Sequence, residues 1–211
     1  MPTEPRYIVG AGGHARVVVD AILQSGDANL IILDSKAETN IGPVLGRFEV
    51  MMLDVAELAE KRCHVAIGSN EARKRICEEL LRWSAPLFSV AHSSSVISKY
   101  GEIGIGCFVA AGSVIGPGAT LGIGTILNHG AIVDHDCSVG NYCHIAPKAV
   151  LGGGVTVEDG VLLGAGAIVL PGVKIAANAI IGAGSVVTRD ISEGGKWLGS
   201  PARPMERSNY E

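Results

Sequence analysis

The stretch AIVDHDCSVGNYCHIAPKAVLGGGV, residues 131–155, carries an aliphatic residue at every sixth position, and this period decides the fold. The period runs from Ile97 to Val187, and every residue on it is Ile, Leu or Val. A period of six matches neither a helical turn nor a plain alternation, but it matches a short strand followed by a corner. Three such units close one triangular coil, with the aliphatic residue pointing inward. The sequence therefore predicts a prism of about five coils, stacked at the strand spacing of roughly 4.8 Å.

The chain before this repeat has a different pattern. Residues 6–26, RYIVGAGGHARVVVDAILQSG, read as a strand, a glycine turn and an amphipathic helix, and residues 29–35 read as a second strand. Helices over 54–62 and 70–83 and strands over 63–69 and 85–92 complete the pattern. We therefore predict a small α/β domain with a Rossmann-like parallel sheet over 1–92, the prism over 93–205 and a tail over 206–211.

Composition and charge exclude several classes of protein. The net charge of −4 offers no basic surface for nucleic acid or for an anionic membrane. The first residues form no long apolar segment, so we expect neither a signal peptide nor a transmembrane helix. The five cysteines are odd in number and lack CxxC spacing, which argues against a disulfide framework and a zinc knuckle. The sequence predicts a cytoplasmic protein with free thiols.

Two glycine turns of the N-terminal domain are candidates for a ligand site. In GAGGHA, residues 10–15, the glycines let the backbone approach a phosphate at a helix N-terminus, although such a turn can also serve packing alone. Because the α/β segment is too short for a full dinucleotide fold, a mononucleotide or a nucleotide sugar fits better. A second turn, AIGSN at 66–70, follows a strand parallel to the one that ends at Asp34. The predicted substrate-binding residues of this domain are Gly10, Gly12, Gly13, His14, Asp34, Gly68, Ser69 and Asn70.

The ionisable residues Asp134, His135 and Asp136 fall on a corner of the prism, because Val133 is on the inward period. One coil further along the chain, the same corner is Gly152 to Gly154. This alignment predicts a notch that holds an imidazole, a carboxylate and free backbone N–H groups at residues 153 and 154. Such a notch suits acyl transfer, with His135 as the base and Asp136 holding its tautomer. A solvated surface histidine is the competing interpretation.

The sequence resembles a family of sugar acetyltransferases that act on UDP-4-amino sugars, perosamine and sialic acid. The resemblance spans nearly the whole chain, in GAGGHARVV (10–18), VAIGSNEARKRI (65–76), NHGAIVDHDCSVGNYCHI (128–145), the glycine corner after KAV (148–150) and GSPARPM (199–205). These enzymes join a nucleotide-sugar α/β domain to a left-handed parallel β-helix of hexapeptide repeats. The resemblance implies the same fold here.

It also implies an activity. We expect an N-acetyltransferase that moves the acetyl group of acetyl-CoA onto the amino group of a nucleotide-linked amino sugar, without a metal ion. The resemblance assigns His135 as general base and Asp136 as its orienting partner, adds Asn128 to the substrate site, and implies a homotrimer with active sites between subunits. The residues expected to bind acetyl-CoA are Gly153, His144, Ala165, Lys148 and Pro201.

Three alternatives stay open at this point. An O-acetyltransferase would use the same base on a sugar hydroxyl. Some hexapeptide β-helices are trimeric zinc carbonic anhydrases, for which His129, His135 and His144 are the candidate ligands. A third alternative is a non-catalytic scaffold that has kept the prism.

Overall fold

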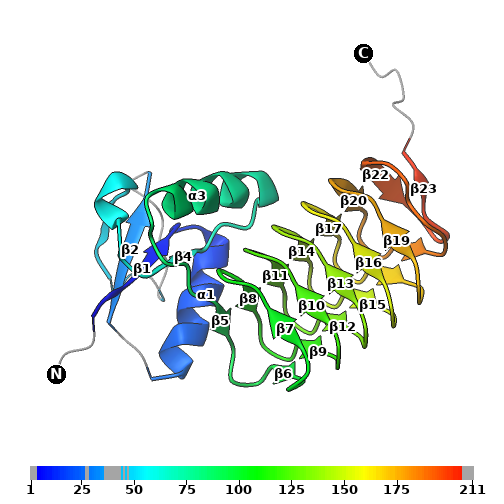
Figure 1. Ribbon diagram of the computed structural model, residues 1–211, viewed down its shortest axis with the longest axis horizontal. Coiled ribbons are helices and arrows are strands. Elements are labelled where there is room, and N and C mark those ends of the chain that lie inside the picture. The colour runs from blue at the N-terminus through cyan, green and yellow to red at the C-terminus, as the bar shows by residue number, and fades with distance from the viewer. Residues whose placement is uncertain (1–3, 27–28, 36–43, 45, 47, 206–211) are drawn as a thin grey trace, which may run out of the picture.

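A computed structural model describes residues 4–26, 29–35, 44, 46 and 48–205, and the tail predicted over 206–211 lies outside them. The two predicted parts are both present (Figure 1): a small α/β domain comes first, and a column of short strands runs from it toward the C-terminus. Within the described ranges, no helix combines the length and apolarity needed to cross a membrane.

The N-terminal domain is built on a four-stranded sheet in the order β3-β2-β1-β4, and its strands are parallel. The strands are β1 (Arg6–Val9), β2 (Leu30–Asp34), β3 (Val50–Met52) and β4 (Cys63–Val65). β3 was not predicted, because only three residues form it and its methionines are exposed. The helix α1 (Gly13–Gln24) buries Val18, Val19 and Ile22.

The helix α3 (Asn70–Arg82) begins where the sequence predicts it. The Ser69 side chain caps its first turn by accepting a hydrogen bond from the N–H of Ala72, at 3.4 Å. The predicted helix over 54–62 is wrong in extent, because only the 3₁₀ turn η1 (Ala56–Leu58) forms. This segment has a single buried apolar residue, Leu58, which is too little for a longer helix to pack on.

The segment 85–92, predicted as the last strand of the first domain, is shared between the two domains. Leu87 makes an isolated bridge to Cys63 beside β4. The next residues form β5 (Val90–Ala91), which pairs with β8 in the column. The column therefore begins just before the predicted boundary at residue 92, and the chain passes from one domain to the other without a linker.

The column is a left-handed parallel β-helix with three faces, and each strand between residues 90 and 169 pairs with the strand eighteen residues further on, as in Ile132 with Val150. The last two strands, residues 195–198 and 203–204, pair with each other antiparallel. We name one face for the domain that covers it and the other two for their outward side chains. The covered face contains β5, β8 (Phe108–Val109), β11 (Ile126–Leu127), β14 (His144–Ile145), β17 (Leu162–Leu163), β20 (Ala179–Ile181), β22 (Gly195–Leu198) and β23 (Arg203–Pro204). The aliphatic face contains β6 (Val96–Ile97), β9 (Val114–Ile115), β12 (Ile132–Val133), β15 (Val150–Leu151), β18 (Ile168–Val169) and β21 (Val186–Val187). The polar face contains β7 (Glu102–Ile103), β10 (Thr120–Leu121), β13 (Ser138–Val139), β16 (Thr156–Val157) and β19 (Lys174–Ile175).

The inside of the prism confirms the hexapeptide prediction. Residues on the six-step period form one continuous core, of which only Ile97 and Ile103, at the N-terminal end, are partly exposed. Cys107, Cys137 and Cys143 are buried in the same core, as expected for the small inward position.

The three faces differ in what lies outside them. On the covered face, Phe108 and Ile126 are buried in a cluster with Val18, Val19 and Ile22 of α1, so the first domain sits directly on the prism. The polar face turns hydrophilic side chains outward: Glu102, Thr120, Ser138, Thr156 and Lys174. The aliphatic face turns only Val and Ile outward: Val96, Val114, Ile132, Val150, Ile168 and Val186.

Candidate active site

His135 stands on a corner between the aliphatic and polar faces, which we call the His135 edge (116–118, 134–136, 152–154). Its Nδ1 lies 2.9 Å from Oδ2 of Asp136. Because a carboxylate can only accept, Nδ1 carries the proton and Nε2 is left with its lone pair. The hydrogen bond to Asp136 and then the charge of Asp134 raise the pKa of His135 above 6.5. Asp134 also accepts from the N–H of His135, at 2.7 Å, and so caps the corner turn.

Gly153 lies directly above the imidazole. A Cβ atom added to Gly153 would collide with Nε2 of His135 and would lie 2.5 Å from Cε1. The N–H of Gly153 has no hydrogen-bond partner within the described part of the chain. The prediction of a second free donor at Gly154 is wrong, because its N–H donates to the carbonyl of His135, at 2.9 Å, as part of coil stacking. The edge thus places one free imidazole nitrogen near one free amide donor.

The coil below also has a glycine where it stacks against this corner. A Cβ at Gly116 would lie 2.7 Å from the backbone nitrogen of His135, so only glycine lets these two corners stack. Asp136 adopts a φ of 58°, a left-handed conformation that Asp tolerates better than most residues.

A second group of predicted residues meets on the covered face and on its corner with the aliphatic face, the Asn128 edge (128–130, 146–148, 164–166). Nδ2 of Asn128 lies 3.0 Å from Nε2 of His144. His144 also hydrogen-bonds the backbone of Gly68, and burial, reinforced by the charge of Arg73, lowers its pKa to about 4. Its imidazole is therefore neutral at pH 7, with both nitrogens used inside the chain.

His14, in the first turn of α1, lies beside His144, with 6.4 Å between the ring centres. Its Nε2 is buried and has no hydrogen-bond partner among the residues that the structure describes, and burial lowers the pKa of His14 to about 3. A buried nitrogen without a partner is costly unless a ligand supplies one. This observation supports His14 as a substrate-binding residue.

The two glycine turns lie side by side at the carboxyl ends of β1 and β4. Gly10 has a φ of 115°, and a Cβ there would lie 2.8 Å from the carbonyl oxygen of Ala66. Asp34 accepts from the N–H of Ala11, at 2.7 Å, which fixes the first turn. Gly12 and Gly13 are exposed at the start of α1, next to His14, and a Cβ added at Gly68 would lie 3.8 Å from Cβ of His14.

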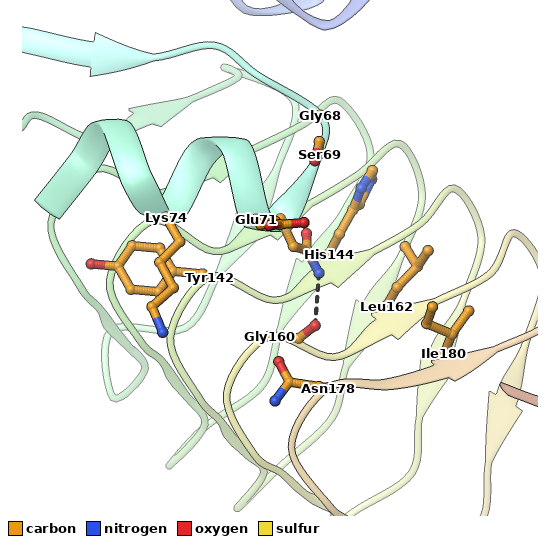
Figure 2. A pocket seen from close by; sticks show the side chains of 11 residues that line it. Gly68, Ser69, Glu71, Lys74, Tyr142, His144, Gly160, Leu162, Asn178 and Ile180 are labelled. Carbon is orange, nitrogen blue, oxygen red and sulfur yellow. Dashed lines mark hydrogen bonds between the residues drawn. The ribbon is translucent and has the colours of Figure 1, made fainter. Parts of the chain in front are cut away.

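A cavity of about 630 Å³ lies between the start of α3 and the covered face. In Figure 2, Ser69, Glu71 and Lys74 come from the α3 side, and Tyr142, Gly160 and Asn178 come from the opposite corner of the prism. Leu162 and Ile180 extend from His144 along the same wall (Figure 2). His144 thus lines this cavity and also contacts Asn128.

The structure separates the predicted site into two groups within one chain. His135, Asp136 and Gly153 lie on the His135 edge. Asn128, Lys148 and Ala165 lie on the Asn128 edge, where the N–H of Lys148 donates to the carbonyl of His129, at 2.9 Å. Pro201 is exposed in the loop between β22 and β23. The aliphatic face lies between the two edges.

Comparisons with known proteins agree with this architecture. A family model described as the PglD N-terminal domain matches residues 7–80, and the bacterial transferase hexapeptide model, six repeats, matches residues 154–189. GDP-perosamine N-acetyltransferase of Escherichia coli O157:H7 is 31% identical, over 95% of this chain and 96% of its own length. The chain belongs to this family of hexapeptide-repeat sugar acetyltransferases.

Two solved structures of sugar acetyltransferases contain relevant ligands. A mutant GDP-perosamine N-acetyltransferase from Caulobacter crescentus, in complex with CoA and GDP-perosamine, is 36% identical with a TM-score of 0.90, covering 97% of this chain and 98% of that one. The acetyltransferase domain of PglB from Neisseria gonorrhoeae FA1090, in complex with acetyl coenzyme A, is 29% identical with a TM-score of 0.87, covering 95% and 98%.

The histidines named for the zinc alternative do not meet in one chain of this sugar acetyltransferase. His129 and His144 lie toward the Asn128 edge, whereas His135 lies on the other edge of the aliphatic face. In the ranges that the structure covers, no group of three or more His, Cys, Asp or Glu could hold a metal ion.

Sequence reasoning missed the junction between the two domains. Asn70 was predicted as a substrate ligand, but its side-chain amide donates to the carbonyls of Gly160 and Val161, at 3.0 and 3.2 Å. Arg73, which received no role, is buried beside it. The sequence could have revealed this burial, because Arg73 has the helical spacing that places it on one face of α3 with Ile76, Cys77 and Leu80.

Proposed function

We propose that this protein is an acetyl-CoA-dependent N-acetyltransferase that acetylates the amino group of a nucleotide-linked amino sugar. The observation that carries the proposal is the pairing on the His135 edge, where a tautomer-fixed imidazole lies against Gly153, whose N–H is free among the described residues. The relatives that carry CoA, GDP-perosamine or acetyl-CoA support the choice of both substrates. The names of the curated and solved relatives favour a nitrogen acceptor over a hydroxyl.

The chemistry is a direct transfer. The amine nitrogen attacks the thioester carbonyl carbon while Nε2 of His135 removes its proton, which contributes about 10²–10⁴-fold to the rate. The N–H of Gly153 donates to the oxyanion of the tetrahedral intermediate, and Asp136 stabilises the imidazolium. When the intermediate collapses, the carbon–sulfur bond breaks and the His135 imidazolium returns its proton to the CoA thiolate, which regenerates the neutral base. The cysteines take no part, because Cys107 and Cys143 are buried and burial raises the pKa of their thiols to about 11 and about 12.

The N-terminal domain holds the acceptor in this proposal. Gly10, Gly12, Gly13 and Gly68 let the backbone approach the diphosphate at the carboxyl ends of the strands. The unpartnered Nε2 of His14 is available to the substrate between these turns and His144. The sugar then lies over the pair of His144 and Asn128, so His144, which was predicted from the sequence to bind acetyl-CoA, belongs to the acceptor side in this proposal.

We also propose a homotrimer, in which the aliphatic face is the interface. Val96 is 62% and Ile168 is 42% exposed in the single chain, and the outward residues of this face are all β-branched aliphatics. Because the His135 edge and the Asn128 edge both border this face, a threefold arrangement brings one edge of each subunit toward the other edge of its neighbour. Acetyl-CoA would lie in the resulting groove, along Lys148 and Ala165 toward Pro201.

A cytoplasmic location is part of the proposal. All five cysteines are free and buried, which fits a reducing compartment.

The test is an acetylation assay with a panel of UDP-, GDP- and dTDP-linked amino sugars, followed by release of the CoA thiol. We expect thiol release with at least one amine and none with its hydroxyl counterpart, and mass spectrometry should find the acetyl group on nitrogen. His135→Ala should lose about 10²–10⁴-fold in rate. Unchanged transfer in that variant would remove the base assignment, and turnover of the hydroxyl sugar alone would favour the O-acetyltransferase.

A further inference from the structure

Arg73 is a buried cation at the junction of the two domains. It lies in the first turns of α3, and only 1% of its surface is exposed. No carboxylate forms an ion pair with it among the described residues. Burial lowers the pKa of its guanidinium to about 10, so the group keeps its charge at neutral pH. A buried cation of this kind is stable only where many hydrogen-bond acceptors surround it.

On the prism side, the acceptors are carbonyls on successive coils. Gly124, Tyr142 and Gly160 are eighteen residues apart, and each ends a corner with a positive φ, of 61°, 55° and 73°. Arg73 donates to Gly124 through Nε, at 2.6 Å, and to Tyr142 through Nη2, at 2.9 Å. Asn70 donates to the third carbonyl, Gly160, at 3.0 Å, which is the dashed line in Figure 2. The start of α3 is therefore fastened to three coils at the same corner.

On the domain side, the same guanidinium binds the second glycine turn. Nη1 of Arg73 donates to the carbonyls of Ile67 and Gly68, at 3.0 and 3.2 Å. Nη2 also donates to Oδ1 of Asn70, at 2.7 Å. Gly68 is the residue whose backbone hydrogen-bonds His144. The Arg73 side chain thus links the glycine turn 67–70 to the prism coils. Through Gly68 it is also linked to His144, the residue that contacts Asn128.

We propose that Arg73, acting with Asn70, is a positioning residue that fixes the glycine turn 67–70 over the His144 and Asn128 pair. This inference rests on the proposed function. The acceptor would be held at two places, its nucleotide in the N-terminal domain and its amino sugar on the prism, and Arg73 sets the separation between them. Acetyl-CoA contacts only the prism in this scheme. Loss of Arg73 should therefore impair use of the acceptor and leave use of the donor unchanged.

The test compares Arg73→Met and Arg73→Lys with two controls on the same helix. Leu80→Ala removes a buried side chain of α3 that makes none of the Arg73 hydrogen bonds. This variant controls for a general loss of stability. Arg75→Met removes an exposed arginine two residues from Arg73. Lysine keeps the charge but has a single nitrogen, which cannot reach the carbonyls on both sides.

Two measurements decide the inference. With the amino-sugar nucleotide that the wild type acetylates, we expect both Arg73 variants to raise the KM for that acceptor at least tenfold, with the KM for acetyl-CoA within twofold. Without substrate, hydrogen exchange at residues 67–70 should accelerate at least tenfold in both variants and in neither control. An equal change of both KM values, the same KM pattern in Leu80→Ala, or unchanged exchange at 67–70 would overturn the positioning role. A wild type that acetylates no amino-sugar nucleotide would instead refute the proposed function. The exchange result would still decide whether Arg73 fixes the turn 67–70.

Discussion

The substitution Gly153→Ala tests the geometry of the site directly. Gly153 has no left-handed φ, so alanine brings no backbone strain. Its new methyl carbon would lie 2.5 Å from Cε1 of His135, whereas two carbons in contact prefer about 3.5–4.0 Å, so the imidazole must retreat by roughly 1 Å. A misplacement of about 1 Å at a reacting group costs on the order of 10²-fold in rate. We expect kcat to fall about a hundredfold.

Stability should hardly change, by less than about 1 kcal/mol, because an exposed ring at the end of a side chain can move aside. The matched control is Gly154→Ala. Gly154 has a φ of 70° and open space around its Cβ position, so alanine costs about 1–2 kcal/mol in stability but touches no catalytic group. Steady-state kinetics and urea unfolding of the two variants give opposite profiles if the reasoning holds. A Gly153→Ala enzyme that keeps its kcat within threefold, with its fold intact, refutes the placement of the reacting base opposite this glycine.

The remaining predictions concern pH, assembly and coil stacking. Asp136→Asn removes the main cause of the raised pKa of His135, so the acid limb of kcat/KM should move to lower pH and the plateau should fall about tenfold; an unmoved limb in a pH profile would contradict the pairing. Ile132→Lys places a charge on the aliphatic face and should convert the proposed trimer to monomers with at least a tenfold loss of activity, which light scattering and the transfer assay measure together. Gly164→Ala would put a Cβ 2.5 Å from the backbone nitrogen of Ala183, so chemical denaturation should show a loss of about 1–3 kcal/mol, and wild-type stability would argue against the tight corner.

The prism was predictable because its period leaves few alternatives. Once Val133 is placed inward, the position of His135 on a corner and of Gly153 one coil later follow by counting, and the structure has both residues on one edge. The counting treated both corner N–H groups as free, whereas the third residue of each corner on this edge donates to the preceding coil, as Asp136 does to Pro117 and Gly154 to His135.

Contacts between the domains were harder to predict from the sequence. Asn70 follows a glycine turn in a typical ligand-binding position, and nothing local distinguishes a substrate ligand from a group that binds the prism. The division between the His135 edge and the Asn128 edge, by contrast, follows from counting, because Asn128 falls six residues, one corner, before Asp134. Residues so close in the chain lie on different edges because each corner turns the strand direction by one face of the triangle.

Within a single chain, the attachment of α3 to the corners at Gly124, Tyr142 and Gly160 leaves the described coils beyond them attached only to neighbouring coils. An extra eighteen-residue turn inserted there would shift the C-terminal cap by one rung, about 4.8 Å, and would leave the base, the glycine notch and the helix junction where they are. Length at that end is therefore a modular property of the molecule, adjustable in whole turns during evolution or by engineering, while the lower coils keep a fixed number of rungs between the two substrates.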